Sequence, residues 1–135
     1  MRLGITAFAT DRSMDVVALA RAVEERGFSS LYLPEHTHIP VSRLTPPPTG
    51  ESVLAEEYKR TLDPLVALAA AAAVTTTLVL GTGISVVAQR YPIVTAKAVA
   101  TLDHLSGGRA VLGVGYGWNR DEIEHRMLCP STSTA

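Results

Sequence analysis

Two short apolar segments of this chain each end in a Gly-x-Gly pattern, and one helical segment lies between them. They cover residues 78–83 and 109–115. Glycine lets a ligand approach the backbone closely, so a buried strand that ends in glycines is suited to the edge of a binding site. Two such strands separated by a helix predict parallel pairing, because parallel strands need a long crossover connection. We therefore expect their carboxyl ends to form one shared rim.

The rest of the chain continues the same alternation of strands and helices. Apolar, β-compatible segments at 3–8, 28–33, 78–83 and 109–114 alternate with helical segments at 14–23, 63–75 and 92–105, and a further helix is predicted at 119–126. This order predicts an α/β fold with a parallel sheet and right-handed crossovers. The spacing fits either a small doubly wound sheet or half of an eight-unit barrel. In both folds ligands bind at the carboxyl ends of the strands.

Composition excludes several classes of function. The chain has 135 residues, 47% hydrophobic and 19% charged, with a formal net charge of −1, which is typical of one globular domain. No run of Lys or Arg is present, so we expect no nucleic-acid partner. The most apolar stretch, 63–74, is shorter than the roughly 20 residues that a membrane span requires, and the N-terminus lacks a signal peptide. We expect a cytoplasmic protein with no membrane association.

The glycine pairs do not match a dinucleotide-binding fingerprint, because both lack the third glycine of G-x-G-x-x-G. The single cysteine, Cys129, excludes an intrachain disulfide and a zinc-thiolate cluster. His36 and His38 follow the second strand, but no acidic or Cys ligands recur at matching spacing, so no metal site is predicted.

Three residues near strand ends are candidates for chemistry. His36 directly follows the second strand, where an imidazole that titrates near neutrality could donate or accept a proton, although a solvated surface histidine fits the same pattern. Trp118 and Asn119 follow the fourth strand. They could stack on and hydrogen-bond a planar heterocycle, or pack under the next helix. The proline-rich loop at 34–62, with one possible turn at 55–59, is expected to cover a substrate, since long loops in compact domains are usually functional or disordered.

Several motifs together resemble one family. Pro34-Glu35-His36, Leu80-Gly81-Thr82-Gly83-Ile84 and the run from Thr101 to Asn119 are similar to the luciferase-like monooxygenase superfamily, and within it to F420-dependent oxidoreductases of actinobacteria. The similarity extends over residues 1 to about 126. It implies a TIM-type (β/α)₈ barrel that binds flavin or coenzyme F420 at its carboxyl-end rim. Only about four of the eight units are present here, so a half-barrel is expected.

The resemblance also implies roles for particular residues. A non-prolyl cis peptide at Gly83-Ile84 would support the cofactor ring, and His36 would be the catalytic residue beside that ring. The residues implied to bind the cofactor are Gly83, Ile84, Ser85, Val86, Trp118 and Asn119. F420-dependent dehydrogenases carry an acid soon after the fourth-strand glycines, whereas this chain has Trp118 there, with Asn119, Asp121 and Glu122 following, so the resemblance assigns no proton-transfer partner.

The resemblance favours an F420-dependent oxidoreductase that transfers a hydride between F420 and a small organic substrate under the loop at 37–60. An FMN-dependent monooxygenase of the same fold and a non-catalytic, self-associating half-barrel are the alternatives. We expect residues 1–128 to form the family half-barrel, whereas 129–135 resemble nothing in the family. Unpaired edges on the first and fourth strands would favour association, so a homo-oligomer is expected.

Overall fold

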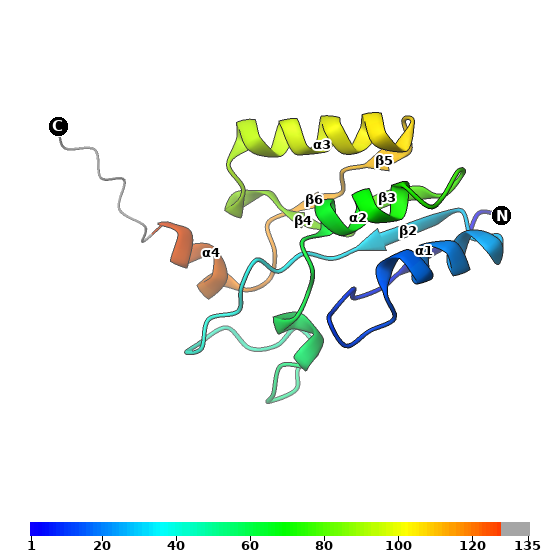
Figure 1. The fold of residues 1–135 in the computed structure, drawn as a ribbon. Helices are drawn as coiled ribbons and strands as arrows, with labels where there is room; N and C mark the ends of the chain where they lie inside the picture. Colours follow the sequence, from blue (N-terminus) through cyan, green and yellow to red (C-terminus); the bar gives the residue numbers. More distant parts are fainter. Residues whose placement is uncertain (128–135) are drawn as a thin grey trace.

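Strands and helices alternate along the chain much as the sequence predicts (Figure 1). The computed structural model describes residues 1–127; the expected tail at 129–135 and Cys129 lie outside this part. The strands are β1 Gly4–Thr6, β2 Ser30–Leu33, β3 Val79–Thr82, β4 Ser85–Val86, β5 Ala110–Val111 and β6 Val114–Gly115. The helices are α1 Val16–Glu25, α2 Pro64–Ala72, α3 Pro92–Ser106 and α4 Arg120–Met127, with short 3₁₀ turns η1 Glu56–Lys59 and η2 Val87–Gln89.

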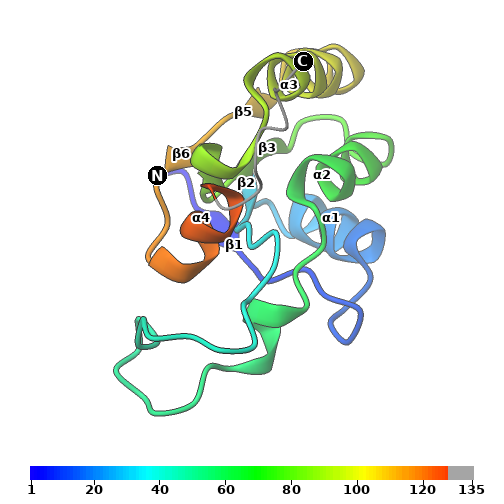
Figure 2. The ribbon, with the colours of Figure 1, turned by 90° about the vertical axis from the view of Figure 1, so that its left-hand side faces the viewer.

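The order of the strands decides between the two folds that the sequence left open. β1, β2, β3 and β5 form one parallel sheet in the order in which they occur in the chain. In a doubly wound sheet the strand order reverses near the first strand, so that helices cover both faces. Here α1, α2 and α3 cover a single face (Figure 2). This is the arrangement of half a (β/α)₈ barrel, and the predicted α/β half-barrel is confirmed.

The hydrophobic core lies between the sheet and these three helices. Leu31, Leu33 and Leu80 project from neighbouring strands toward the helices and are at most 1% exposed. Leu68 of α2 is fully buried against them, because α2 lies between α1 and α3 and is apolar on nearly all sides. α2 is nine residues long, and no helix in the described part of the chain is long and apolar enough to cross a membrane.

Two helix ends show how the sequence sets element boundaries. The Asp63 side chain accepts hydrogen bonds from the backbone N–H groups of Leu65 and Val66, at 2.9 and 3.1 Å, and Pro64 occupies the first helical position of α2. An acid that caps a proline-led first turn is a strong helix start. α3 ends at Gly107, whose φ of 68° places it in the left-handed region that glycine tolerates best. Both boundaries agree with the sequence prediction.

The predicted fourth strand, 109–114, is wrong in its continuity. The chain instead forms β5, which pairs with β3, and then β6, which pairs with β4. The carbonyl of Gly113 lies at the break and accepts hydrogen bonds from the Ser85 N–H and the Thr82 hydroxyl, both at 2.7 Å. β3 ends at Thr82, and the chain pairs again only at β4. The fourth strand is divided at the same level into β5 and β6, so that each part stays hydrogen-bonded to its partner strand.

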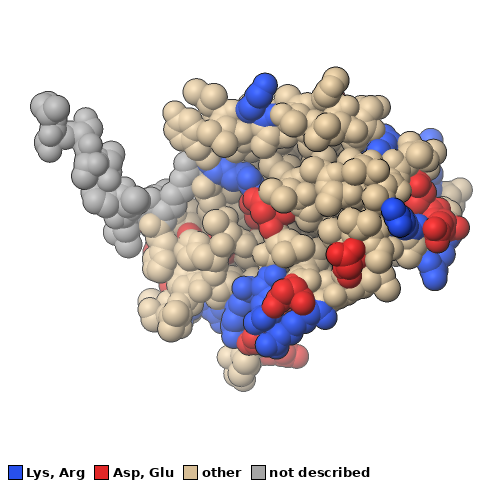
Figure 3. Space-filling view, in the orientation of Figure 1, with Lys and Arg blue, Asp and Glu red and all other residues tan. Residues whose placement is uncertain are grey.

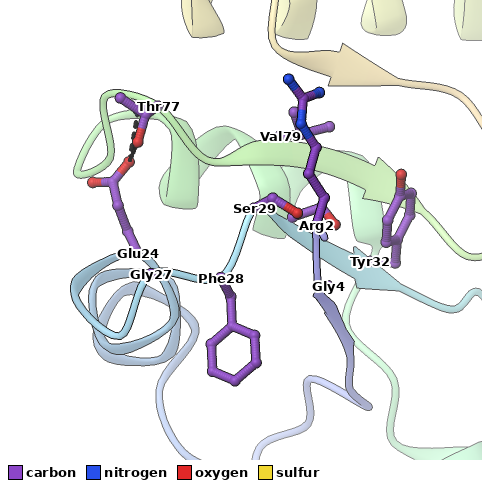
Figure 4. A pocket seen from close by; sticks show the side chains of 10 residues that line it. Arg2, Gly4, Glu24, Gly27, Phe28, Ser29, Tyr32, Thr77 and Val79 are labelled. Atoms are coloured by element: carbon purple, nitrogen blue, oxygen red, sulfur yellow. Dashed lines mark hydrogen bonds between the residues drawn. The ribbon is translucent and has the colours of Figure 1, made fainter.

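The face of the sheet opposite the helices is open. Ser30 of β2 pairs with Val79 of β3 there. Two residues further along the strands, Tyr32 pairs with Gly81. A cavity of about 680 Å³ extends over this face at the amino ends of the strands, with Arg2 at its margin (Figure 4). On the outer surface, acidic and basic side chains are intermixed in the view of Figure 3. Successive side chains of a strand point to opposite faces of the sheet, so one set forms the core and the other set forms the open face.

Glu24 ties the amino-end loops of the half-barrel together. Its carboxylate accepts hydrogen bonds from the backbone N–H groups of Thr76, Thr77 and Leu78, which lead into β3, and from the Thr77 hydroxyl (Figure 4). Partial burial acts to raise the pKa of Glu24, but the hydrogen bonds from these backbone groups outweigh it and lower the pKa to about 2. The charged form therefore holds the connection between α2 and β3.

Stability should depend on pH through this carboxylate. The pKa of Glu24 is depressed below its ordinary 4.5, so its contribution is present above pH 4.5 and lost as the pH falls toward 2. We expect Glu24→Gln to lower the free energy of unfolding by about 2 kcal/mol at neutral pH and to flatten its decline over that window. Urea unfolding at a series of pH values measures both effects. Glu25→Gln, on the exposed neighbouring residue, is the matched control and should change neither.

Candidate active site at the carboxyl ends of the strands

A small cavity lies at the carboxyl ends of β2 and β3. It encloses about 180 Å³. Most of its wall comes from the end of β2, the segment after β3 and the segment after β6, and Phe8, Pro48 and Tyr58 complete the lining. The lining includes His36, Tyr58, Gly83, Ile84, Val86 and Trp118. The rim predicted from the paired glycine-ended strands is thus a real concave site, as expected for parallel α/β sheets.

His36 is held in this cavity by a buried acid. Its Nδ1 lies 2.8 Å from Oε2 of Glu122, and the two side chains are 7% and 2% exposed. The second carboxylate oxygen of Glu122 accepts a hydrogen bond from the Thr37 N–H at 3.0 Å. Since Glu122 lies in the first turn of α4, this helix places the acid against the loop that follows β2. The imidazole is therefore fixed in orientation, with Nδ1 committed to the carboxylate.

The ionisation of Glu122 depends on His36. Burial acts to raise the pKa of the Glu122 carboxyl, but the hydrogen bond and the charge of His36 outweigh burial and lower the pKa below its ordinary value. An ionised carboxylate only accepts hydrogen bonds, so His36 donates to Glu122 from a protonated Nδ1. Carboxylate–imidazole pairs of this kind set the tautomer of a histidine in many active sites.

A second part of the cavity wall is formed by the segment after β3. The Gly83–Ile84 peptide is cis, as the family resemblance implies. Gly83 continues the ladder by donating its N–H to the Leu33 carbonyl at 2.8 Å. Ile84 is 37% exposed and lines the cavity together with Val86. Ser85 is fully buried and does not line it; its hydroxyl donates to Glu35 at 2.6 Å.

Two aromatic rings pack against His36. The Tyr58 ring centroid lies 5.4 Å from that of His36 and 4.9 Å from that of Phe8. Trp118 meets His36 edge-on at 5.8 Å and Tyr58 at 5.9 Å with an interplanar angle of 89°. Such edge-to-face contacts add about 0.5–1.5 kcal/mol each beyond the area they bury.

The two residues predicted after the fourth strand are placed differently. Trp118 lines the cavity, and the Arg43 guanidinium lies over its ring at 5.8 Å from the centroid. Asn119 is 1% exposed and is not among the lining residues. Neither its amide nitrogen nor its amide oxygen has a hydrogen-bond partner within residues 1–127. Trp118 is thus part of the cavity wall, whereas Asn119 is buried outside the lining at the start of α4, and their roles toward a cofactor stay predictions.

The loop after β2 is fixed to α4 at further points. Oxygens of Asp121 accept hydrogen bonds from the N–H groups of Leu44 and Thr45 and from the Thr45 hydroxyl. These hydrogen bonds lower the pKa of Asp121 to about 2, and the bond from the Thr45 hydroxyl contributes most. His38 Nε2 lies 3.3 Å from His125 Nδ1 on the exposed side of the same contact. The loop expected to cover a substrate is therefore anchored to the helix that carries Glu122.

Sequence reasoning did not assign roles to Tyr58 and Glu122. Tyr58 lies in η1, within a loop whose path has no periodic signal. Glu122 is 86 positions from His36, so no local pattern links them. The available signal was the position of Glu122 in the first turn of a helix that follows a strand end, where acids are favoured and point back toward the rim. Within residues 1–127, no three His, Cys, Asp or Glu side chains gather to hold a metal ion.

Comparison with known proteins identifies the family. Residues 2–127 match the luciferase-like monooxygenase family, and the chain belongs to it. An uncharacterized protein of Mycobacterium tuberculosis is 49% identical over 132 residues, which cover 96% of this chain and 47% of that protein. The 5,10-methylenetetrahydromethanopterin reductase of Methanopyrus kandleri is 29% identical over 114 residues, 84% of this chain and 26% of that enzyme. The chain thus spans about half the length of the mycobacterial relative.

Solved structures share the fold. A monooxygenase from Streptomyces bottropensis superposes with a TM-score of 0.72 at 28% identity, over 94% of this chain and 36% of that one. The coenzyme F420-dependent tetrahydromethanopterin reductase of Methanopyrus kandleri superposes with a TM-score of 0.65 at 26% identity, over 96% of this chain and 30% of that one. The chain therefore corresponds to about a third of these enzymes and is a partial barrel of the luciferase-like type.

Proposed function

We propose that this chain provides the ring-binding half of an F420-dependent oxidoreductase that transfers a hydride between F420 and a small organic substrate. The observation that carries the proposal is the buried His36–Glu122 pair, whose His36 lines the same cavity as the Gly83–Ile84 segment. Similarity to an F420-dependent reductase at 26% identity supports the choice of cofactor.

The residues around the cavity suit a planar, largely apolar ring. Ile84, Val86 and Trp118 supply apolar and aromatic walls, and His36 supplies one titratable group, a combination typical of cofactor sites. Gly117 also lines the cavity with a φ of 77°, and a Cβ there would lie 3.4 Å from a Val86 methyl. A side chain at this position would therefore narrow the space between the two walls. When bound, F420 would supply the hydride chemistry.

In this proposal His36 holds or releases a proton at Nε2. Glu122 fixes the imidazole through Nδ1, so the ring cannot turn away from the cavity without breaking a buried ion pair. Tyr58 and Trp118 exclude water from the two sides of the imidazole. The loop at 37–60, anchored to α4 by Asp121, covers the substrate side. The protein thus contributes orientation, proton transfer and exclusion of water.

An FMN-dependent monooxygenase is the second candidate, favoured by the similarity to the Streptomyces monooxygenase. Equilibrium ultrafiltration with F420 and with FMN distinguishes the two. The proposal expects retention of F420 and weaker retention of FMN, and tight FMN retention without F420 retention would contradict it. Gly117→Val, which fills the cavity wall, should abolish F420 retention. Gly50→Val, at an exposed glycine with a similar φ of 77°, is the matched control.

Self-association is a separate proposal that concerns the open edges. Within residues 1–127, β1 pairs only with β2 and β5 pairs only with β3, so both ends of the sheet carry unpaired backbone groups. A second copy could cover these edges, as unpaired strands commonly require. Analytical ultracentrifugation should then show a species of at least twice the chain mass of 14.3 kDa, whereas a monomer at high concentration would contradict association.

A further inference from the structure

Glu35, the residue before His36, has a buried carboxylate that is fully engaged. Its side chain is 3% exposed. One oxygen, Oε2, accepts hydrogen bonds from the Ser85 hydroxyl at 2.6 Å and from the Val86 N–H at 2.9 Å. The other oxygen, Oε1, accepts from Nε of Arg90 at 2.7 Å. Glu35 therefore joins the end of β2 to β4 and to the segment after η2.

Arg90 extends this connection to the helix layer. Its guanidinium also donates to Oδ2 of Asp63 at 2.7 Å, and Asp63 caps the first turn of α2 through its other oxygen. Burial disfavours the charged guanidinium, but the carboxylates of Glu35 and Asp63 outweigh burial and raise the pKa of Arg90 above its ordinary value. The network thus runs from the cap of α2 through Arg90 to Glu35, and from Glu35 to the cavity wall.

The network of Glu35 and Arg90 lies next to the cavity and connects two segments of its lining. Glu35 and Val86 both line the cavity, and Val86 belongs to the same wall as Gly83 and Ile84. The next residue after Glu35 is His36, which lines the same cavity. Glu35 bonds the Val86 backbone through its side chain while its own backbone carries His36, so it links the two segments that line the cavity. Hydrogen bonds to charged, buried groups are the strong ones, so this link is rigid.

We propose that Glu35 is a positioning residue that holds the 83–86 wall at the distance from His36 that a flat cofactor ring requires, with Arg90 orienting its carboxylate. The inference rests on the proposed function for the identity of the ligand, but the geometry it assigns can be tested without any cofactor. Glu35 itself needs no contact with the reacting atoms.

Glu35→Gln tests the role sharply because an amide cannot replace this carboxylate. Arg90 Nε–H and Val86 N–H donate to opposite oxygens, and glutamine offers one acceptor and one donor group. One of the two bonds must therefore break. Because the charged guanidinium of Arg90 holds the amide oxygen more strongly than the Val86 N–H does, we expect the bond to Val86 to be the one that is lost. Adding Arg90→Gln supplies an acceptor for the N–H of the introduced amide and should restore the bond to Val86. The double variant is thus the rescue.

The first measurement is amide hydrogen exchange by NMR on the protein without cofactor. Protection of the Val86 N–H should fall at least tenfold in E35Q relative to the Leu80 N–H, which is bonded to the Arg109 carbonyl in the same sheet. It should recover in E35Q/R90Q. E24Q, the same substitution at the opposite end of the sheet, should leave the Val86-to-Leu80 ratio unchanged. An unchanged ratio in E35Q would overturn the proposal.

The second measurement is the dissociation constant for F420. It should rise at least tenfold in E35Q, stay within twofold of wild type in E24Q, and recover in E35Q/R90Q. Equal affinity in E35Q and wild type would overturn the positioning role while leaving the proposed function standing. If wild type bound no F420 while Val86 protection fell as expected, the proposed function would fail and the assigned wall geometry would stand.

Discussion

Replacing His36 by alanine is expected to slow hydride transfer between F420 and a small organic substrate by about 10²- to 10⁴-fold, the usual contribution of one general acid or base. The physical reason is the loss of the only imidazole among the described residues that line the cavity, which Glu122 holds in place through Nδ1. The affinity for F420 should change much less, because the walls at Ile84 and Trp118 remain. The measurement is the rate of F420 reduction in stopped flow with a panel of small organic substrates.

Glu122→Gln is the companion variant. It should slow the same reaction by about tenfold, since a neutral amide still occupies the space but no longer balances a charged imidazole. Because Glu122 acts through His36, the double variant H36A/E122Q should be no slower than H36A alone. Independent, multiplicative effects would contradict the pairing of the two side chains in catalysis. His38→Ala, at an exposed imidazole outside the cavity, is the control.

Gly113→Ala is expected to have the largest effect on stability. A Cβ on Gly113 would lie 2.3 Å from the carbonyl oxygen of Thr82, a backbone atom that cannot move without separating β3 from the neighbouring strand. The Gly113 carbonyl also accepts the bonds from Thr82 and Ser85 that hold the break between β5 and β6. We expect a loss of about 3 kcal/mol or more in the free energy of unfolding, measured by urea denaturation.

Two other glycines provide graded controls. A Cβ on Gly81 would meet the Tyr32 ring at 2.3 Å, but this ring is a side chain on the open face and can turn aside, so Gly81→Ala should cost less. Gly50 has a φ of 77° and nothing within 4 Å, so Gly50→Ala should cost only the strain of a left-handed alanine, about 1 kcal/mol. If Gly113→Ala were the mildest of the three, the assigned strand break would be wrong.

The sequence was sufficient for those parts of the fold that local patterns determine. Apolar runs gave the four main strands, and Asp63-Pro64 and Gly107 gave helix ends within a residue or two. It could not separate a doubly wound sheet from a barrel, because that choice depends on which strands pair, a contact between distant segments. The split of the fourth strand was missed for the same reason: Gly113 is fixed by Thr82 and Ser85, about 30 positions earlier.

The candidate site was predicted in part. His36, Gly83, Ile84, Val86 and Trp118 meet in one cavity because they follow parallel strand ends, which sequence can locate. Ser85 and Asn119 were expected to bind cofactor, yet they lie outside the lining. Ser85 points away from the cavity because successive side chains of a strand alternate between its faces. Asn119 is buried at the start of α4. The partners Glu122 and Tyr58 come from a helix and a loop whose docking only the three-dimensional structure defines.

The most direct test of the account is titration of the wild-type protein with F420, followed by tryptophan emission. Trp118 is the single tryptophan in the chain, and it forms part of the cavity wall beside His36. A deazaflavin ring bound in this cavity would contact the indole and quench its emission. We expect that F420 causes a saturable loss of most of the Trp118 emission. Unchanged emission at F420 concentrations where ultrafiltration detects binding would place the ligand elsewhere and contradict the assigned site.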